Sequence, residues 1–275
     1  MVRGRDGLRM PAFGLGTWRM GESKSERAAE IAALKLGLDQ GVCLIDTAEM
    51  YGGGGAEEIV AEALSGRRDG VFIVSKVMPQ NASRTGTIRA AEASLKRLKT
   101  DRIELYLLHW PGSHPLDETL EAFDRLKRDG KIRHYGVSNF DVNEMTKAAQ
   151  GTLGAAIASN QVMYNLARRG IETRLLPWCA KRDVVVMAYS PLDRGRLQAT
   201  KGLREIAARH GVTPEAIAIA WTMRLPNLVT IPKATSLAHV RANLTAATID
   251  LSAADLALLD DDYKPPKGDV PLDME

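Results

Sequence analysis

The chain has 275 residues, a length that suits either two average domains or one β/α barrel of about 250 residues or more. Its 37 Lys and Arg residues against 34 Asp and Glu residues give a formal charge of +3, which excludes a global attraction to nucleic acid or to anionic membranes. The apolar runs fall far short of the ~20 residues that span a bilayer, and the N-terminus lacks the apolar core of a secretory signal. Cys43 and Cys179 fit reduced structural thiols. We therefore expect a cytoplasmic protein.

Short apolar runs recur along the whole chain. The first residues predict a turn at Asp6-Gly7 and, with it, a short N-terminal β-hairpin. Eight strand-sized runs follow, each bounded by Gly, Pro or charge: FGLGTW, VCLID, VFIVSK, IELYLLH, IRHYGVS, AAIASNQ, VVVMAYS and LVTIP. Runs that are apolar on both faces are typical of a parallel sheet covered by helices.

Amphipathic helices are predicted between these runs. Ser83 and Thr213, the latter followed by proline, are expected N-caps. Apolar residues repeat near the helical period in three stretches: Ile31, Leu34 and Leu38; Ile88, Ala91, Leu95 and Leu98; Leu116, Leu120, Phe123 and Leu126. The alternation of strand and helix predicts an α/β fold, a single (β/α)8 TIM barrel in one domain over residues 1–275.

Four polar or titratable residues stand where apolar runs stop. Asp46 ends the second run, Lys76 the third and His109 the fourth, while Tyr51 lies in the loop after Asp46. Parallel strands end at the same rim of a barrel, and barrel enzymes keep their chemistry at that rim. We therefore expect these four side chains to converge.

Together the four side chains suit the reduction of a carbonyl group. A phenol has a pKa of about 10 in water, and an adjacent ammonium held by a carboxylate makes its proton easier to release. Asp46, Lys76 and Tyr51 would form such a relay, and the neutral imidazole of His109 would orient a carbonyl oxygen. Each residue alone also has a structural explanation, as a loop cap, strand end, turn aromatic or core histidine. Their combination favours catalysis.

Other candidate sites are weaker. The glycines from Gly52 to Gly55 are followed by no Lys-Ser/Thr, so they predict a flexible loop rather than a phosphate cradle. His114 and His134 have no further ligands at metal spacing, and we expect no metal site. No strand is followed by GxGxxG and a helix, which argues against a Rossmann dinucleotide site.

The order of these motifs resembles that of the aldo-keto reductase family along nearly the whole chain. The segments that carry the resemblance are GLGTW, LIDTAEMYG, VSK, LLHWP, GKIRHYGVSNF, SNQVMYN, AYSPL and IPKAT. Further similarity in GGAEEIVAEAL and RGIETRLLPWC is closest to a bacterial branch that reduces methylglyoxal and related small aldehydes. The resemblance implies a catalytic tetrad in which Tyr51 donates the proton, Lys76 and Asp46 tune it, and His109 orients the substrate.

The resemblance also implies a nicotinamide dinucleotide bound across the barrel rim. Ser138, Asn139 and Gln161 would hold the nicotinamide amide, and Tyr189 would stack on its ring. The positions that match the cofactor contacts of the family are Gly16, Thr17, Trp18, Asp46, Ser138, Asn139, Gln161, Tyr189, Ser190, Pro191, Leu192, Ile231, Lys233, Thr235, His239 and Asn243.

The chemistry of one cation favours NADPH over NADH. Lys233 follows the eighth run, where it can pair with the 2′-phosphate that distinguishes the two cofactors. His239 stands where NADPH-selective relatives often carry arginine, and Arg241 is offset by two positions. NADH therefore stays open as a weaker cofactor.

The substrate side is less defined. We expect Trp18, Tyr51, His109 and Trp110 to line the pocket for a small carbonyl compound. Monomer is the common state of the resembled family. Two other functions stay open: a cofactor-binding regulatory subunit with little turnover, and a lyase that uses Lys76 as a Schiff base. The physiological substrate and the direction of reaction do not follow from the sequence.

Overall fold

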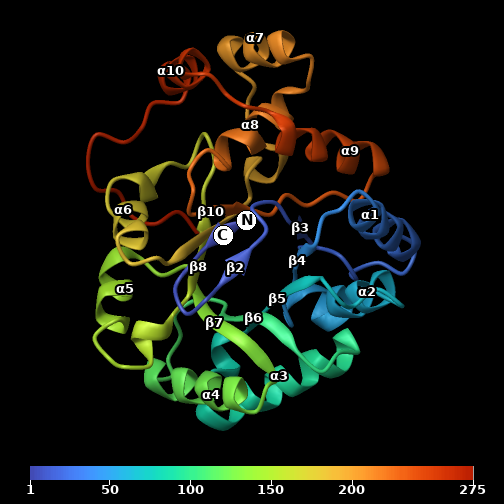
Figure 1. Ribbon diagram of the computed structural model, residues 1–275, viewed down its shortest axis with the longest axis vertical. Coiled ribbons are helices and arrows are strands. Elements are labelled where there is room, and N and C mark those ends of the chain that lie inside the picture. The colour runs from blue at the N-terminus through green and yellow to red at the C-terminus, as the bar shows by residue number, and fades with distance from the viewer. Residues whose placement is uncertain (275) are drawn as a thin grey trace.

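Eight parallel strands form the centre of the molecule, and helices surround them (Figure 1). The structure is a computed structural model that describes residues 1–274. Neighbouring strands in the sheet follow chain order from β3 to β10, as expected when each strand is joined to the next by a helical crossover. The predicted (β/α)8 barrel is confirmed, and its organisation as a single domain stays a prediction.

Each of the eight apolar runs of the sequence overlaps a strand of the barrel. The strands are β3 (Leu15–Gly16), β4 (Leu44–Asp46), β5 (Phe72–Val77), β6 (Ile103–Leu108), β7 (Ile132–Ser138), β8 (Ser159–Met163), β9 (Val185–Tyr189) and β10 (Leu228–Thr230). The helices are α1 (Arg27–Asp39), α2 (Gly55–Ala63), α3 (Arg84–Leu98), α4 (Leu116–Arg128), α5 (Val142–Ala148), α6 (Leu175–Ala180), α7 (Lys201–His210), α8 (Pro214–Thr222), α9 (Leu237–Thr245) and α10 (Ala253–Asp262).

The predicted helix starts are confirmed at two caps. The hydroxyl of Ser83 accepts a hydrogen bond from the backbone N–H of Gly86 at the start of α3. Thr213 does the same for Ala216 at the start of α8, where Pro214 occupies the first turn. These side chains satisfy N–H groups that a helix leaves without an intrahelical partner.

Backbone bridges close the sheet into a barrel between its first and last strands. Phe13 pairs with Thr230 and Gly16 pairs with Lys233, both in the parallel sense. A Cβ atom added at Gly16 would lie 2.8 Å from the carbonyl oxygen of Ile231, closer than real Cβ contacts come. Glycine at this position therefore allows the two strands to approach and the ring to close.

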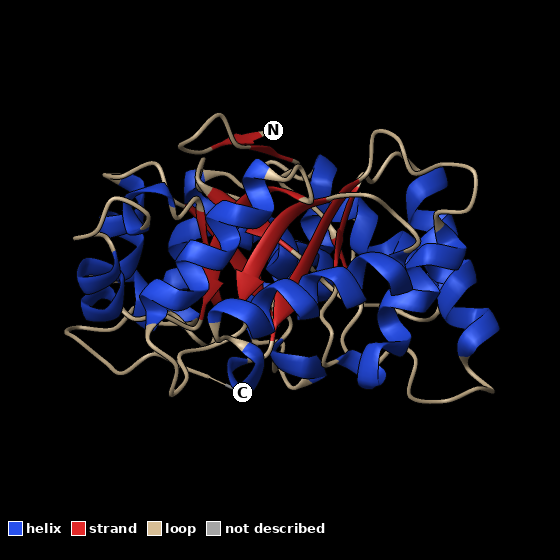
Figure 2. Ribbon diagram, turned by 90° about the horizontal axis from the view of Figure 1, so that it is seen from below, coloured by secondary structure: helices blue, strands red, loops and turns tan. Residues whose placement is uncertain are grey.

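The predicted N-terminal hairpin covers the amino end of the barrel. It consists of β1 (Val2–Arg3) and β2 (Arg9–Met10), which pair in the antiparallel sense. The backbone N–H of Arg5 donates to the carbonyl of Asp183, just before β9 begins. Figure 2 shows this hairpin lying across one end of the strands. The opposite end, where the strands finish, is left to the loops that carry the predicted site.

Apolar side chains fill the barrel below that rim. One buried cluster joins the hairpin to the inward-facing residues of the strands: Val2, Leu8, Met10, Leu44, Val74, Leu105, Leu107, Ala158, Val185, Met187, Val229 and Ile231. A second and larger cluster packs the outer faces of the strands against the helices. Within residues 1–274, no helix has both the length and the apolar character needed to cross a bilayer.

Candidate active site

Asp46, Lys76 and Tyr51 meet at the carboxyl rim, as the sequence predicts. The Lys76 Nζ atom donates to both carboxylate oxygens of Asp46, at 2.9 and 2.8 Å, and to the backbone carbonyl of Thr47 at 2.9 Å. It also lies 3.2 Å from the phenolic oxygen of Tyr51. The three N–H bonds of an ammonium thus have three acceptor groups, of which the tyrosine is one.

This ion pair is almost completely buried. The side chain of Lys76 is 0% exposed and that of Asp46 is 3% exposed. Burial lowers the pKa of Lys76, while the carboxylate of Asp46 acts in the opposite direction through its charge and its hydrogen bonds. Asp46 therefore keeps a positive charge beside the phenol in surroundings that would otherwise disfavour it.

His109 follows β6 directly and lies against Tyr51. The two rings are 5.7 Å apart, centre to centre, in an edge-to-face arrangement. Burial and the nearby charge of Lys76 lower the pKa of His109 to about 2. The imidazole is therefore neutral at physiological pH, the state that the sequence analysis assigns to it.

Tyr51 is carried by a tight glycine turn. Residues Tyr51–Gly54 form a short 3-10 segment that is kinked, since Gly52, Gly53 and Gly54 have positive φ values of 57°, 60° and 96°. Residues other than glycine rarely adopt this backbone conformation. The glycine run predicted as a flexible loop is therefore the turn that connects the tyrosine to α2.

The residues predicted to hold the nicotinamide amide are linked to one another and to the tetrad. Gln161 donates to the carboxylate of Asp46 across the barrel at 2.7 Å. Asn139 donates to the carbonyl of His109 at 3.1 Å and accepts from the Tyr189 hydroxyl at 2.9 Å. The hydroxyl of Ser138 donates to the Gln161 carbonyl. The carboxyl ends of β7, β8 and β9 thus form one polar network with the candidate catalytic groups.

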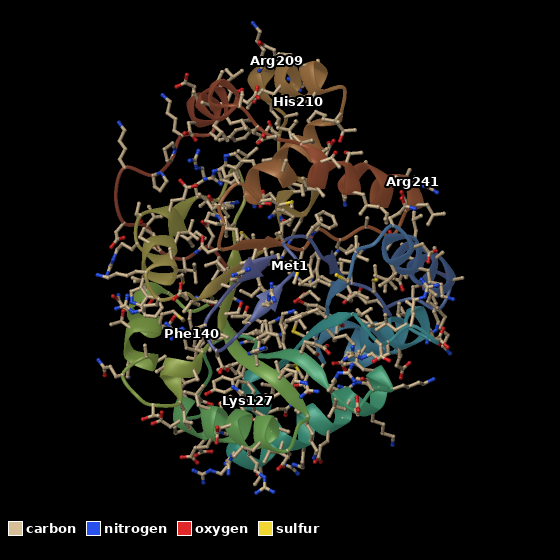
Figure 3. The ribbon with its side chains drawn as sticks, in the orientation of Figure 1. Met1, Lys127, Phe140, Arg209, His210 and Arg241 are labelled. Atoms are coloured by element: carbon tan, nitrogen blue, oxygen red, sulfur yellow. The ribbon has the colours of Figure 1, made fainter. Side chains whose placement is uncertain are left out.

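Other predicted cofactor residues follow β9 and β10 or lie on α9. Ser190, Pro191 and Leu192 follow β9, and the buried Asn165 donates to the Ser190 carbonyl. The residues that follow β10 are Ile231, Lys233 and Thr235, and those on α9 are His239 and Asn243. Lys233 and His239 are exposed, whereas Asn243 is buried. Figure 3 shows Arg241, also on α9, at the outer edge of the molecule.

The two tryptophans predicted for the substrate pocket are both partly buried. Trp110 follows His109, and their rings lie 4.8 Å apart. Trp18 lies beyond β3, and the guanidinium groups of Arg19 and Arg194 each lie 4.6 Å from its ring centre. Stacking of a guanidinium on an aromatic face is attractive, so Trp18 connects the loops that follow β3 and β9.

Sequence reasoning missed several supporting groups of this site. Arg19 and Arg194 carry no motif, and the Thr47 carbonyl that accepts from Lys76 is a backbone group. A sequence pattern holds no signal for such contacts, because they depend on how separate loops approach one another. Among residues 1–274, no cluster of three or more potential metal ligands is found.

Comparisons with known proteins agree with this fold. Residues 12–264 match the model of the aldo/keto reductase family. The chain is 47% identical to the methylglyoxal reductase YeaE of Escherichia coli, over 100% of this chain and 98% of the relative. It is 31% identical to a glyoxal reductase of Bacillus subtilis, over 94% and 91% of the two chains.

Solved structures give the same result. The crystal structure of an aldo/keto reductase from Klebsiella pneumoniae in complex with NADP and acetate superposes with a TM-score of 0.96 at 47% identity, covering 100% of this chain and 99% of that one. A structure from the same organism in complex with NADPH also has a TM-score of 0.96. The chain therefore belongs to the aldo/keto reductase family.

Proposed function

We propose that this protein reduces small aldehydes or α-dicarbonyls of the methylglyoxal kind to alcohols, with NADPH as the cofactor. The proposal rests on the 3.2 Å contact between the phenolic oxygen of Tyr51 and the Nζ atom of Lys76. Lys76 is buried and forms an ion pair with Asp46. The contact between Tyr51 and Lys76 supplies an acid next to a positive charge that Asp46 stabilises. Similarity to reductases of methylglyoxal and glyoxal supports the choice of substrate class.

The residues present fit a nicotinamide dinucleotide. Amide-bearing side chains from Asn139 and Gln161 gather at the rim beside the half-buried ring of Tyr189. Lys233, which follows β10, is an exposed cation. When bound, the cofactor supplies the hydride. Similarity to structures in complex with NADP and NADPH supports its identity.

Tyr51 is proposed to give its proton to the oxygen of the substrate carbonyl as hydride reaches the carbon. The ammonium of Lys76 stabilises the phenolate that remains, since opposite charges in a buried site attract strongly. Asp46 fixes the position of Lys76 through two hydrogen bonds and balances its charge. The positive charge of Lys76, which stabilises the phenolate, is thus already in place before the reaction.

His109 is proposed to orient the same carbonyl oxygen. Its Nδ1 atom is buried and has no hydrogen-bond partner among the described residues. The other ring nitrogen, Nε2, is therefore the one that can reach a substrate. Because the pKa of His109 is lowered to about 2, the ring acts as a neutral donor and does not compete with Tyr51 as the acid.

A direct assay tests the proposal. NADPH oxidation is followed with methylglyoxal, glyoxal, simple aldehydes and keto sugars, and each rate is compared with that for NADH. We expect turnover with the small aldehydes and dicarbonyls. Tight NADPH binding without oxidation of any substrate would instead support a regulatory subunit. Inactivation by borohydride in the presence of substrate would support a Schiff base on Lys76.

We also propose that the protein acts as a monomer in the cytoplasm on a small carbonyl substrate. The near-neutral charge and the two cysteines, neither in a disulfide, support this setting. Light scattering coupled to size-exclusion chromatography measures the mass in solution. A mass of twice the 30.0 kDa chain would contradict the monomer.

A further inference from the structure

Behind the proposed site lies a carboxylate with no exposure to solvent. The side chain of Glu57, in the first turn of α2, is 0% exposed. One of its oxygens accepts from the hydroxyl of Ser75 at 2.6 Å, and the other accepts from Nε of Arg97 at 2.6 Å. Both oxygens are thus engaged by separate elements, the strand β5 and the helix α3.

Ser75 connects this carboxylate to the lysine of the tetrad. It precedes Lys76 on β5, and successive side chains of a strand point to opposite faces. Lys76 therefore enters the barrel while Ser75 points outward to α2, where it meets Glu57. The hydrogen bond holds the outer face of β5 at the position from which Lys76 reaches the phenol.

Arg97 connects the same carboxylate to the turn that carries Tyr51. A Cβ atom added at Gly54 would lie 2.6 Å from Cδ and 2.7 Å from Nε of Arg97, so the arginine packs directly against this glycine. Its guanidinium also donates to the hydroxyl of Ser94 within α3. The arginine is thereby held in place while it supports the last glycine of the turn.

The turn needs such support because of its composition. Three successive glycines with positive φ follow Tyr51, and glycine loses more conformational freedom on ordering than any other residue. A buried ion pair is also costly to form and contributes little net stability compared with apolar packing. The pair of Glu57 and Arg97 thus fixes the positions of neighbouring segments rather than adding net stability. The charge of Glu57 additionally raises the pKa of Lys76, in the same direction as Asp46.

We propose that Glu57, Arg97 and Ser75 form a positioning array that holds the phenol of Tyr51 at the distance from Lys76 that proton transfer requires. The inference rests on the proposed role of Tyr51 as the proton donor. The three residues are positioning residues, because they touch the segments that carry Tyr51 and Lys76 and not the reacting atoms.

The chain offers a matched control at the other end of the same strands. Arg68 donates to both oxygens of Glu104 on β6 at 2.9 Å, and Glu104 also accepts from the backbone N–H of Ile73 at the start of β5. The two side chains are 19% and 15% exposed. This pair has the chemistry of Arg97 and Glu57 but lies at the amino end, away from the turn.

The test compares Arg97→Lys with Arg68→Lys. Lysine keeps the charge and loses the directed Nε–H bond of arginine. We expect Arg97→Lys to lower kcat about tenfold to a hundredfold, since small misplacements of reacting groups have effects of that size. The dissociation constant for NADPH should not change. Amide hydrogen exchange in residues 51–56 should become faster. Arg68→Lys should lower thermal stability without any of these changes.

Two outcomes would overturn the proposal: an Arg97→Lys protein with the kcat of wild type per folded molecule, or exchange at residues 51–56 that stays at the wild-type rate. If Arg97→Lys does not fold, Ser75→Ala is judged by the same measurements. Should wild type fail to reduce any aldehyde, the proposed function fails, and the exchange comparison still decides whether the array holds the turn.

Discussion

The two ends of the barrel use the same strands for opposite purposes. Towards the amino end, Leu44, Val74 and Leu105 are completely buried among apolar neighbours. Two residues further along β4 and β5, on the same inward face, stand Asp46 and Lys76. Two residues along each strand thus separate the packed apolar core from the charged site. Residues that stabilise the barrel and residues that carry its chemistry are therefore separated along the strand axis.

The backbone differs between the two ends as well. Residues other than glycine rarely adopt positive φ, and such conformations concentrate at functional sites. Among residues 1–274, five of the eight such residues lie in loops at the carboxyl rim, and three lie in turns at the amino end: Arg19, Asn139, Ser190, Asp193 and Arg194 at the rim, and Asp6, Lys99 and Asp183 at the amino end. The amino end carries the hairpin and the apolar cluster, whose burial offsets the cost of the strained rim.

Removing the phenolic hydroxyl should produce the largest effect at the rim. Tyr51→Phe keeps the ring that lies against His109 and removes the proton donor. We expect kcat to fall by a factor of about 10² to 10⁴, the usual contribution of a positioned acid. NADPH binding, measured by fluorescence quenching, should stay close to that of wild type. A variant with an unchanged rate would contradict the assignment of the acid.

A core substitution should show the opposite behaviour. Leu105→Ala removes a completely buried side chain from the apolar cluster below the rim. We expect the free energy of unfolding to fall by about 3 kcal/mol through lost burial and a residual cavity. Because Leu105 contributes no group to the proposed site, kcat per folded molecule should be retained. Denaturant unfolding and steady-state kinetics on the same preparation measure both quantities, and a parallel loss of kcat would show that the two ends are coupled.

The predictability of each part follows from the range of the interactions that form it. The strands and the caps at Ser83 and Thr213 could be predicted because local patterns determine them. The convergence of Asp46, Lys76 and His109 followed from strand ends alone, since a barrel brings consecutive ends to one rim. The role proposed for each residue followed from its side-chain chemistry, and the family resemblance implies the same roles.

Contacts between distant segments could not be predicted in this way. Gln161 reaches Asp46 over 115 residues of sequence, and Glu57 engages Arg97 over 40 residues. Glu57 lies within the apolar stripe of α2, so a charged residue on a buried helix face was the available signal. What it binds depends on the packing of α2 against α3, which the local pattern does not contain.

The neutral state of His109 predicts a pH dependence of stability. Between about pH 2 and 6.5 the imidazole binds a proton in the unfolded chain but not in the folded one, because its folded pKa is lowered to about 2. Stability therefore falls as the pH decreases through this range. From pH 6.5 to 5 this group should lower the free energy of unfolding by about 1.6 kcal/mol.

His109→Gln isolates this contribution, because glutamine does not titrate and the other groups are shared with wild type. Urea unfolding of both proteins at pH 5 and 6.5 gives the difference. We expect the variant to lose less stability on acidification. Equal losses in the two proteins would mean that the ring is protonated in the folded state, which would remove the neutral donor from the proposed mechanism.

The smallest effect is expected at the exposed outer part of the rim, where Lys233 is proposed to recognise the 2′-phosphate. Lys233→Ala should raise the KM for NADPH roughly tenfold, because one hydrogen bond to a charged group contributes about 1.5 kcal/mol. The KM for NADH, which lacks that phosphate, should change little, and kcat should be retained with either cofactor.

Lys201→Ala, at an exposed lysine on α7, is the matched control for a lost surface charge. Equal increases for NADPH and NADH would assign Lys233 to a part that the two cofactors share, and the preference for NADPH would then need another residue.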